Sequence, residues 1–248
     1  MFTADYRDRA RRRLVEVARS DSRIESGAAV GGSALPETDR WSDIDLAFGL
    51  TGGTSIDAVV ADWTRLVEDE FGAVMLFDLR SRSWIYRVFL FPGALQVDLS
   101  FAPGADFGPR GPRFSLLFGA SGAAPETIPP APPQHVFGLG VHHAVRARAC
   151  IERDKAWQAE YWISDLRDQA LGLACLTRGL APEHGRGFDG LPVEVRDHAA
   201  SALVRSLDRP ELERALSTSI GLLLREAANA HLDTGRLDPM LNDLVSGL

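Results

Sequence analysis

The sequence predicts an α+β fold, in which a mixed β-sheet domain flanked by helices precedes an all-α helical bundle domain. Three observations lead to this prediction. Helical and strand-like segments alternate in the first hundred or so residues, Gly and Pro are frequent over 102–134, and helical segments follow from His135. We therefore expect a sheet domain over 1–122, a Pro-rich linker over 123–134 and a helical domain over 135–248.

The first domain is expected to have the order α–β–β–α–β–β–β. Residues 4 to about 20 form an Arg-rich amphipathic pattern, and the next strand ends at Gly31-Gly32. A second strand carries Asp43 and Asp45, and Ser55 is placed to cap a helix that ends near Gly72. Three strands complete the predicted sheet, over 73–79, 84–91 and 95–101.

The second domain is expected to consist of helices alone. Gly- and Pro-containing loops separate them, at Gly179 to Pro182, Gly185 to Pro192 and Arg209-Pro210. The predicted helices cover about 135–152, 154–178, 193–206, 210–232 and 236–247.

Composition and charge limit the function. The 248 residues are 45% apolar and 25% charged, as is usual for a globular protein. The sequence contains no uninterrupted run of about 18 apolar residues, so a membrane span is not expected. The N-terminal residues lack the apolar core of a signal peptide, and Cys150 and Cys175 are expected to be free buried thiols, so we expect a cytoplasmic protein. The net charge of −7 disfavours a nucleic-acid partner and would attract a small cationic molecule.

The chemistry-bearing motif is Gly31-Gly32-Ser33 followed by Asp43-Ile44-Asp45. Small and apolar residues lead into the glycines, which is typical of a buried strand that ends in a tight turn. On a strand, residues two apart share a face, so Asp43 and Asp45 should project together. Two carboxylates at such a short distance repel each other unless a cation lies between them.

Asp98 is the candidate third carboxylate. It is the only charged residue in the strand-like run 95–101. A strand carrying Asp98 beside the strand of Asp43 and Asp45 would place three carboxylates around one or two Mg²⁺ ions, which prefer carboxylate and phosphate oxygens. Two such ions can stabilise the attacking and leaving oxygens of a displacement at phosphorus.

These residues resemble the signature of the DNA polymerase β-type nucleotidyltransferase superfamily. The run Gly32-Ser33-Ala34-Leu35 with Trp41 to Leu46 is most similar to its antibiotic-modifying branch, the aminoglycoside (streptomycin/spectinomycin) and lincosamide nucleotidyltransferases. The resemblance implies a cytoplasmic, Mg²⁺- and ATP-dependent enzyme with an N-terminal catalytic domain and a C-terminal helical domain. Its specific motif covers only about residues 30–50 and 95–101.

The resemblance also implies a role for each motif residue. Asp43, Asp45 and Asp98 would be metal ligands, and Asp98 would also be the base for the acceptor hydroxyl. Gly32 and Ser33 would hold the β- and γ-phosphates.

The pattern departs from the family after the Gly-Ser pair. Many members have a glycine or a basic residue there, whereas this chain has Pro36 and Glu37. The identity of further phosphate contacts is therefore open.

Two residues of the helical half are further candidates for the site. Lys155, the only lysine, would bind the triphosphate, as a basic residue of the helical domain does in related enzymes; the alternative is a solvated helix-end lysine. Glu160, beside Trp157, Tyr161 and Trp162, would bind a cationic acceptor or act as a base; the alternative is a surface or helix-pairing glutamate.

The leading hypothesis is transfer of a nucleoside monophosphate, AMP from ATP, to a hydroxyl of a small molecule such as an aminoglycoside-type antibiotic. The alternative is an antitoxin-like or regulatory module that binds a protein partner or modifies it with AMP. A transferase that adds nucleotides to nucleic-acid ends is disfavoured by the charge balance.

Overall fold

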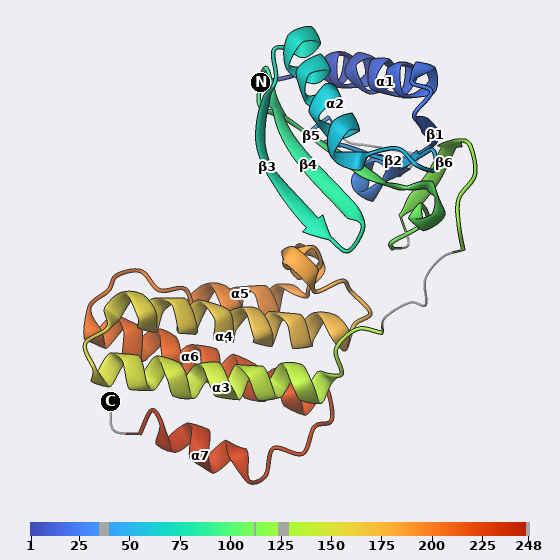
Figure 1. Ribbon diagram of the computed structural model, residues 1–248. Helices are drawn as coiled ribbons and strands as arrows, with labels where there is room; N and C mark the ends of the chain where they lie inside the picture. Colours follow the sequence, from blue (N-terminus) through green and yellow to red (C-terminus); the bar gives the residue numbers. More distant parts are fainter. Residues whose placement is uncertain (35–39, 112, 124–128, 247–248) are drawn as a thin grey trace. The chain divides into compact units, whose positions relative to one another are not determined.

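The computed structural model describes residues 1–34, 40–111, 113–123 and 129–246. It divides into two compact units, Met1–Ile128 and Pro129–Leu248 (Figure 1). Each unit has a large hydrophobic core of its own. The predicted linker lies partly outside the described residues, which omit 124–128.

Unit 1 is built on a six-stranded sheet with the strand order β3-β4-β5-β2-β1-β6. Strands β2 and β5 are parallel and the other neighbours are antiparallel, so the predicted mixed sheet is confirmed. Its elements are α1 (Ala4–Ser20), β1 (Ile24–Val30), β2 (Ile44–Leu50), α2 (Ile56–Phe71), β3 (Val74–Ser81), β4 (Trp84–Phe91), β5 (Leu95–Pro103) and β6 (Phe114–Phe118).

Helices α1 and α2 lie on the same face of this sheet (Figure 1). The Ser55 hydroxyl accepts the Ala58 N–H at the start of α2, and Gly72, at φ 63°, ends the helix in the left-handed region. Phe48 of β2 packs on Trp63 of α2 with 5.0 Å between the ring centroids, and both side chains are buried. Alternate residues of β2 therefore face the helices, and Asp45 and Ala47 face the opposite side of the sheet.

Strand β6 was not predicted. Residues Phe114–Phe118 pair antiparallel with β1 inside a stretch that the Gly and Pro content marks as irregular. The strand is short, and its alternation is weak because Ser115 and Leu116 are both exposed. Its position next to β1 comes from long-range pairing rather than from local sequence.

Unit 2 is all-helical, as predicted, and α3, α4 and α6 all pack against one another. Helix α3 begins two residues earlier than expected because Pro133 takes the first turn, where no amide hydrogen is needed. Arg178 forms an ion pair of 2.9 Å with Glu226, which is fully buried. The helices are α3 (Pro133–Glu152), α4 (Ala156–Leu176), α5 (Val193–Ser201), α6 (Arg209–Asn229) and α7 (Leu237–Asp243).

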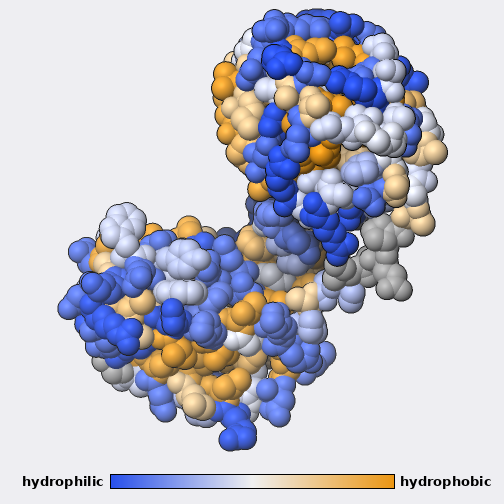
Figure 2. Space-filling model, viewed as in Figure 1, coloured by the Kyte–Doolittle hydropathy of each residue, from blue (hydrophilic) through white to orange (hydrophobic). Residues whose placement is uncertain are grey.

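In the view of Figure 2, the surface of each unit is mostly hydrophilic, and hydrophobic residues are interspersed among the hydrophilic ones. In unit 1 the edge strand β3 exposes Val74, Leu76, Phe77 and Leu79. Cys150 and Cys175 are free and buried, as expected. Within the described ranges, each helix is too short or too polar to cross a membrane.

Asp21 connects the end of α1 to α2 and makes the stability of unit 1 depend on pH. Its carboxylate accepts hydrogen bonds from the Trp63 indole of α2 (3.1 Å) and from the Arg23 guanidinium (2.8 Å), and Arg23 also bonds Asp62. These bonds, chiefly that from Arg23, lower the Asp21 pKa to about 2. Because the folded pKa lies below the unfolded one, the stabilisation is present above pH 4 and disappears as the pH falls through 2.

We therefore expect Asp21→Asn to lower the free energy of unfolding by about 1–2 kcal/mol at pH 7, and to have little effect at pH 2. Urea unfolding followed at several pH values measures this difference. The control is Glu16→Gln, since the ion pair of Glu16 with Arg13 is exposed and 3.9 Å long. A pH-independent difference for Asp21→Asn would contradict the assignment.

Candidate active site

The glycine turn is pressed against Asp45. Strand β1 ends at Val30 and passes into a 3₁₀ turn, Gly31–Ala34. Gly31 has φ 54°, and a Cβ atom at this position would lie 2.5 Å from Asp45 Oδ2. Only glycine combines this backbone conformation with so close an approach. The turn and the carboxylate are thus fixed in contact.

Hydrogen bonds hold the same contact together. The Gly32 N–H donates to Asp45 Oδ2 at 3.2 Å. The buried Ser33 hydroxyl accepts the Asp45 N–H at 2.9 Å and donates to the Asp43 carbonyl at 3.2 Å. Since its one proton is already donated, Ser33 positions the aspartate strand in this structure. Its contact with a phosphate stays a prediction.

Asp45 and Asp98 lie opposite each other on neighbouring strands. The parallel register of β2 and β5 pairs the Cα atoms of Asp45 and Asp98 directly. Asp43 is the residue before β2 begins, two residues from Asp45. All three are half-buried, and the structure therefore brings the backbones of the predicted triad to one end of the β2–β5 pair.

The electrostatics of the site show that the three carboxylates influence one another. Burial, with the charges of Asp43 and Asp98, raises the pKa of Asp45 to about 7. Burial and Asp43 also raise the pKa of Asp98. Hydrogen bonds from the Gln96 amide nitrogen to both Asp98 oxygens, at 3.1 and 3.2 Å, oppose this rise. In the absence of a cation, ionisation of the site is therefore unfavourable, and Asp45 keeps its proton up to about pH 7.

The residues fit Mg²⁺ by chemistry but do not form a closed ligand set. Carboxylate oxygens are the donors that Mg²⁺ prefers. Within the described residues, however, no three His, Cys, Asp or Glu side chains are close enough together to hold an ion as they stand. Like-charged side chains turn apart without a counter-ion, and phosphate oxygens usually supply the remaining ligands in such sites.

The other candidates occupy different surroundings. Lys155 is exposed at the N-terminal end of α4, and the half-buried Glu160 accepts a hydrogen bond from Ser164 at 2.8 Å. Both belong to unit 2, and their part in the site stays a prediction. Pro36 and Glu37, where the motif departs from the family, lie outside the described residues.

Gln96 is a residue of the site that the sequence analysis missed. Its amide binds the Asp98 carboxylate from two positions earlier on β5. The spacing of two residues could have predicted this contact, because side chains two apart on a strand lie on the same face.

Comparison with known proteins gives a distant structural likeness. No family model matches the chain, and no curated protein matches it. Among solved structures, the chain is similar to an aminoglycoside 6-adenyltransferase from Bacillus subtilis. The two chains are 13% identical, and the match covers 94% of this chain and 95% of that one with a TM-score of 0.42. So distant a likeness leaves the function to be argued from the residues of the site.

The fit between the turn and Asp45 can be tested at Gly31. We expect Gly31→Ala to destabilise unit 1 by about 2–4 kcal/mol, because it adds a side chain both at positive φ and against a carboxylate. Gly53→Ala is the matched control, since Gly53 has φ 80° but no atom near its Cβ position. Equal losses in urea unfolding would show that the contact with Asp45 contributes nothing.

The crowding of carboxylates can be tested at Asp45. The raised pKa means that the folded protein loses stability as the pH rises from about 4 to 7, where Asp45 ionises. We expect Asp45→Asn to raise the free energy of unfolding by about 1 kcal/mol at pH 8 in EDTA, and by less at pH 5. Thermal unfolding measures this, with the exposed Asp69→Asn of α2 as the control. Destabilisation at pH 8 would contradict the account.

Proposed function

We propose that this protein is a Mg²⁺-dependent nucleotidyltransferase that transfers AMP from ATP to a hydroxyl of a small molecule and releases pyrophosphate. The observation that carries the proposal is the direct pairing of Asp45 with Asp98, beside a glycine turn that contacts Asp45. Carboxylates on neighbouring strands next to a glycine turn suit a triphosphate and its cation.

In the proposed reaction, the acceptor oxygen bonds to the α-phosphorus and the bond from that phosphorus to the bridging oxygen of the leaving pyrophosphate breaks. The acceptor proton passes to the Asp98 carboxylate, whose raised pKa suits a base. Gln96 holds this carboxylate in place. Bound Mg²⁺, held by Asp43, Asp45 and Asp98, would neutralise the charge on the phosphate oxygens.

The turn has the complementary task of binding the phosphates. Gly31 and Gly32 allow the backbone to approach an anion closely. In this structure the Gly32 N–H donates to Asp45 Oδ2. Ser33 keeps Asp43 and Asp45 in register with this turn through its two hydrogen bonds. Rate acceleration then comes mainly from positioning and electrostatics.

We extend the proposal to Lys155 as a contact of the triphosphate and to Glu160 as a contact of the acceptor. Lys155 has an exposed ammonium, and Glu160 lies one turn from the exposed Trp157 and beside the exposed Tyr161. The proposed acceptor is an aminoglycoside-type antibiotic, on the strength of the sequence resemblance and the net charge of −7.

Release of pyrophosphate tests this function. A panel of hydroxylated acceptors, aminoglycosides included, is incubated with each nucleoside triphosphate and Mg²⁺. We expect Asp43→Asn and Asp98→Asn to reduce the rate by about 10²–10⁴-fold, because each removes a ligand or the base. Asp69→Asn, on the helix-covered side of unit 1, should keep the wild-type rate. Full activity in both site variants would overturn the proposal.

A further inference from the structure

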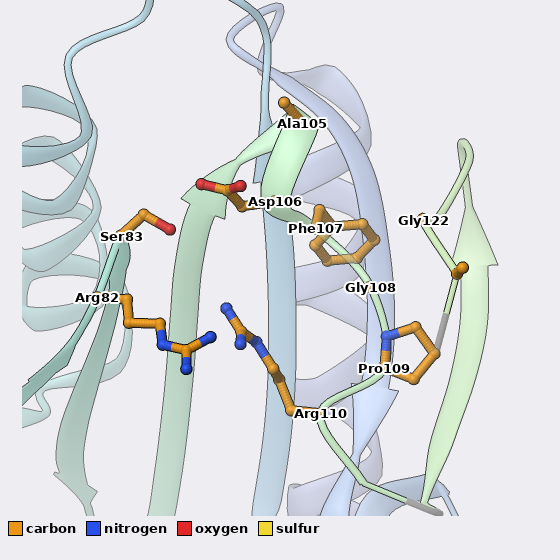
Figure 3. Close-up of a pocket in the computed structure, with 10 residues that line it drawn as sticks. Arg82, Ser83, Ala105, Asp106, Phe107, Gly108, Pro109, Arg110 and Gly122 are labelled. Atoms are coloured by element: carbon orange, nitrogen blue, oxygen red, sulfur yellow. The ribbon is translucent and has the colours of Figure 1, made fainter. Parts of the chain in front are cut away.

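A second feature of unit 1 is a pocket of about 460 Å³ at the turn between β3 and β4 (Figure 3). It lies between this turn and the segment that follows β5. Its lining includes Arg82 and Ser83 from the turn, and Asp106, Phe107 and Arg110 from the later segment. Nothing in the proposed transfer of a nucleotide makes use of these residues.

Two guanidinium groups converge in this pocket. In Figure 3, Arg82 and Arg110 extend toward each other from opposite walls. Over the part of the chain that the structure describes, neither forms an ion pair with a carboxylate. Asp106 is the third charged residue of the lining, so the pocket has a net positive charge within a protein of net charge −7.

The two arginines differ in how the fold places them. Arg82 has φ 54° at the first position of the two-residue turn, where glycine or asparagine is the usual choice. The Arg110 guanidinium lies 4.9 Å from the ring centroid of Trp84, which is buried. Stacking on an aromatic ring fixes an arginine with its donors still free.

We propose that this pocket binds an oxyanion, a phosphate or carboxylate group, between Arg82 and Arg110. Two like charges that face each other are stabilised by an anion between them, and guanidinium groups match the oxygens of both kinds of group. The open pocket is large enough for the group to belong to a larger molecule.

The position of the pocket suggests where such an anion comes from. Tyr86 pairs with Ser100, two residues after Asp98 on the same face of the sheet, and Trp84 lies two residues further along β4. At about 3.3 Å per residue, Trp84 is about 13 Å from Asp98 along the strands. The buried Trp84 and the half-buried Tyr86 stack with 5.7 Å between their centroids, and they lie between the carboxylates and the arginines. An acceptor with an anionic end, which would differ in charge from the cationic aminoglycoside type proposed above, would span this distance. This source of the anion rests on the proposed nucleotidyl transfer, whereas a free anion does not.

The test uses inorganic phosphate and the full chain in EDTA, without nucleotide, so that it is independent of nucleotidyl transfer. We expect saturable shifts of the Trp84 indole N–H signal in NMR, assigned with Trp84→Phe. Arg82→Gln and Arg110→Gln should each weaken binding about tenfold. Asp106→Asn should tighten it, and Arg113→Gln, which removes an exposed charge outside the lining, should leave it unchanged.

Two results would overturn the proposal: no saturable shift, or equal effects of Arg113→Gln and the two pocket variants. Steady-state kinetics then separates the sources of the anion. Phosphate that raises the acceptor KM without changing kcat, and does so only with Arg82 and Arg110 present, identifies an anionic acceptor group. Binding of phosphate without such competition identifies a site for a free anion.

Discussion

The parallel pairing of β2 with β5 is the constraint on which the site depends. It sets Asp45 directly beside Asp98, although α2, β3 and β4 separate them in sequence. Helices α1 and α2 cover one face of the sheet, and the buried Leu46 and Phe48 fix which residues of β2 face them. A shift of one residue would turn the aspartates into that core, so the hydrophobic core itself enforces their position.

Local sequence predicts most of this arrangement. The caps at Ser55 and Gly72 and the alternation of β2 follow directly from residue type. The carboxylate pairing follows once β2 and β5 are taken as neighbours. Strand β6 could not be predicted, because Phe114–Phe118 gains its partner only when β1 is already in place. The two hydrogen bonds between the Ser33 hydroxyl and the backbone of Asp43 and Asp45 could not be predicted either, because they depend on tertiary contacts that residue type alone does not specify.

The face of the sheet opposite the helices has two chemically different regions. Asp45 and Asp98 give one region a negative charge, and Arg82 and Arg110 give the other a positive one. Stacked Trp84 and Tyr86 lie between them, and Trp84 also stacks on Phe107. A cation is required to bring phosphates to the carboxylates, whereas the arginines bind oxyanions directly. A single molecule that reaches both regions would therefore be oriented along β4 and β5.

Anomalous scattering from Mn²⁺, in crystals grown with a non-hydrolysable ATP analogue, tests the central claim most directly. The account predicts a metal peak at about 2.0–2.3 Å from carboxylate oxygens of Asp45 and Asp98, next to the Gly31–Ala34 turn. A metal and nucleotide bound elsewhere, with these two carboxylates turned away from both, would contradict it.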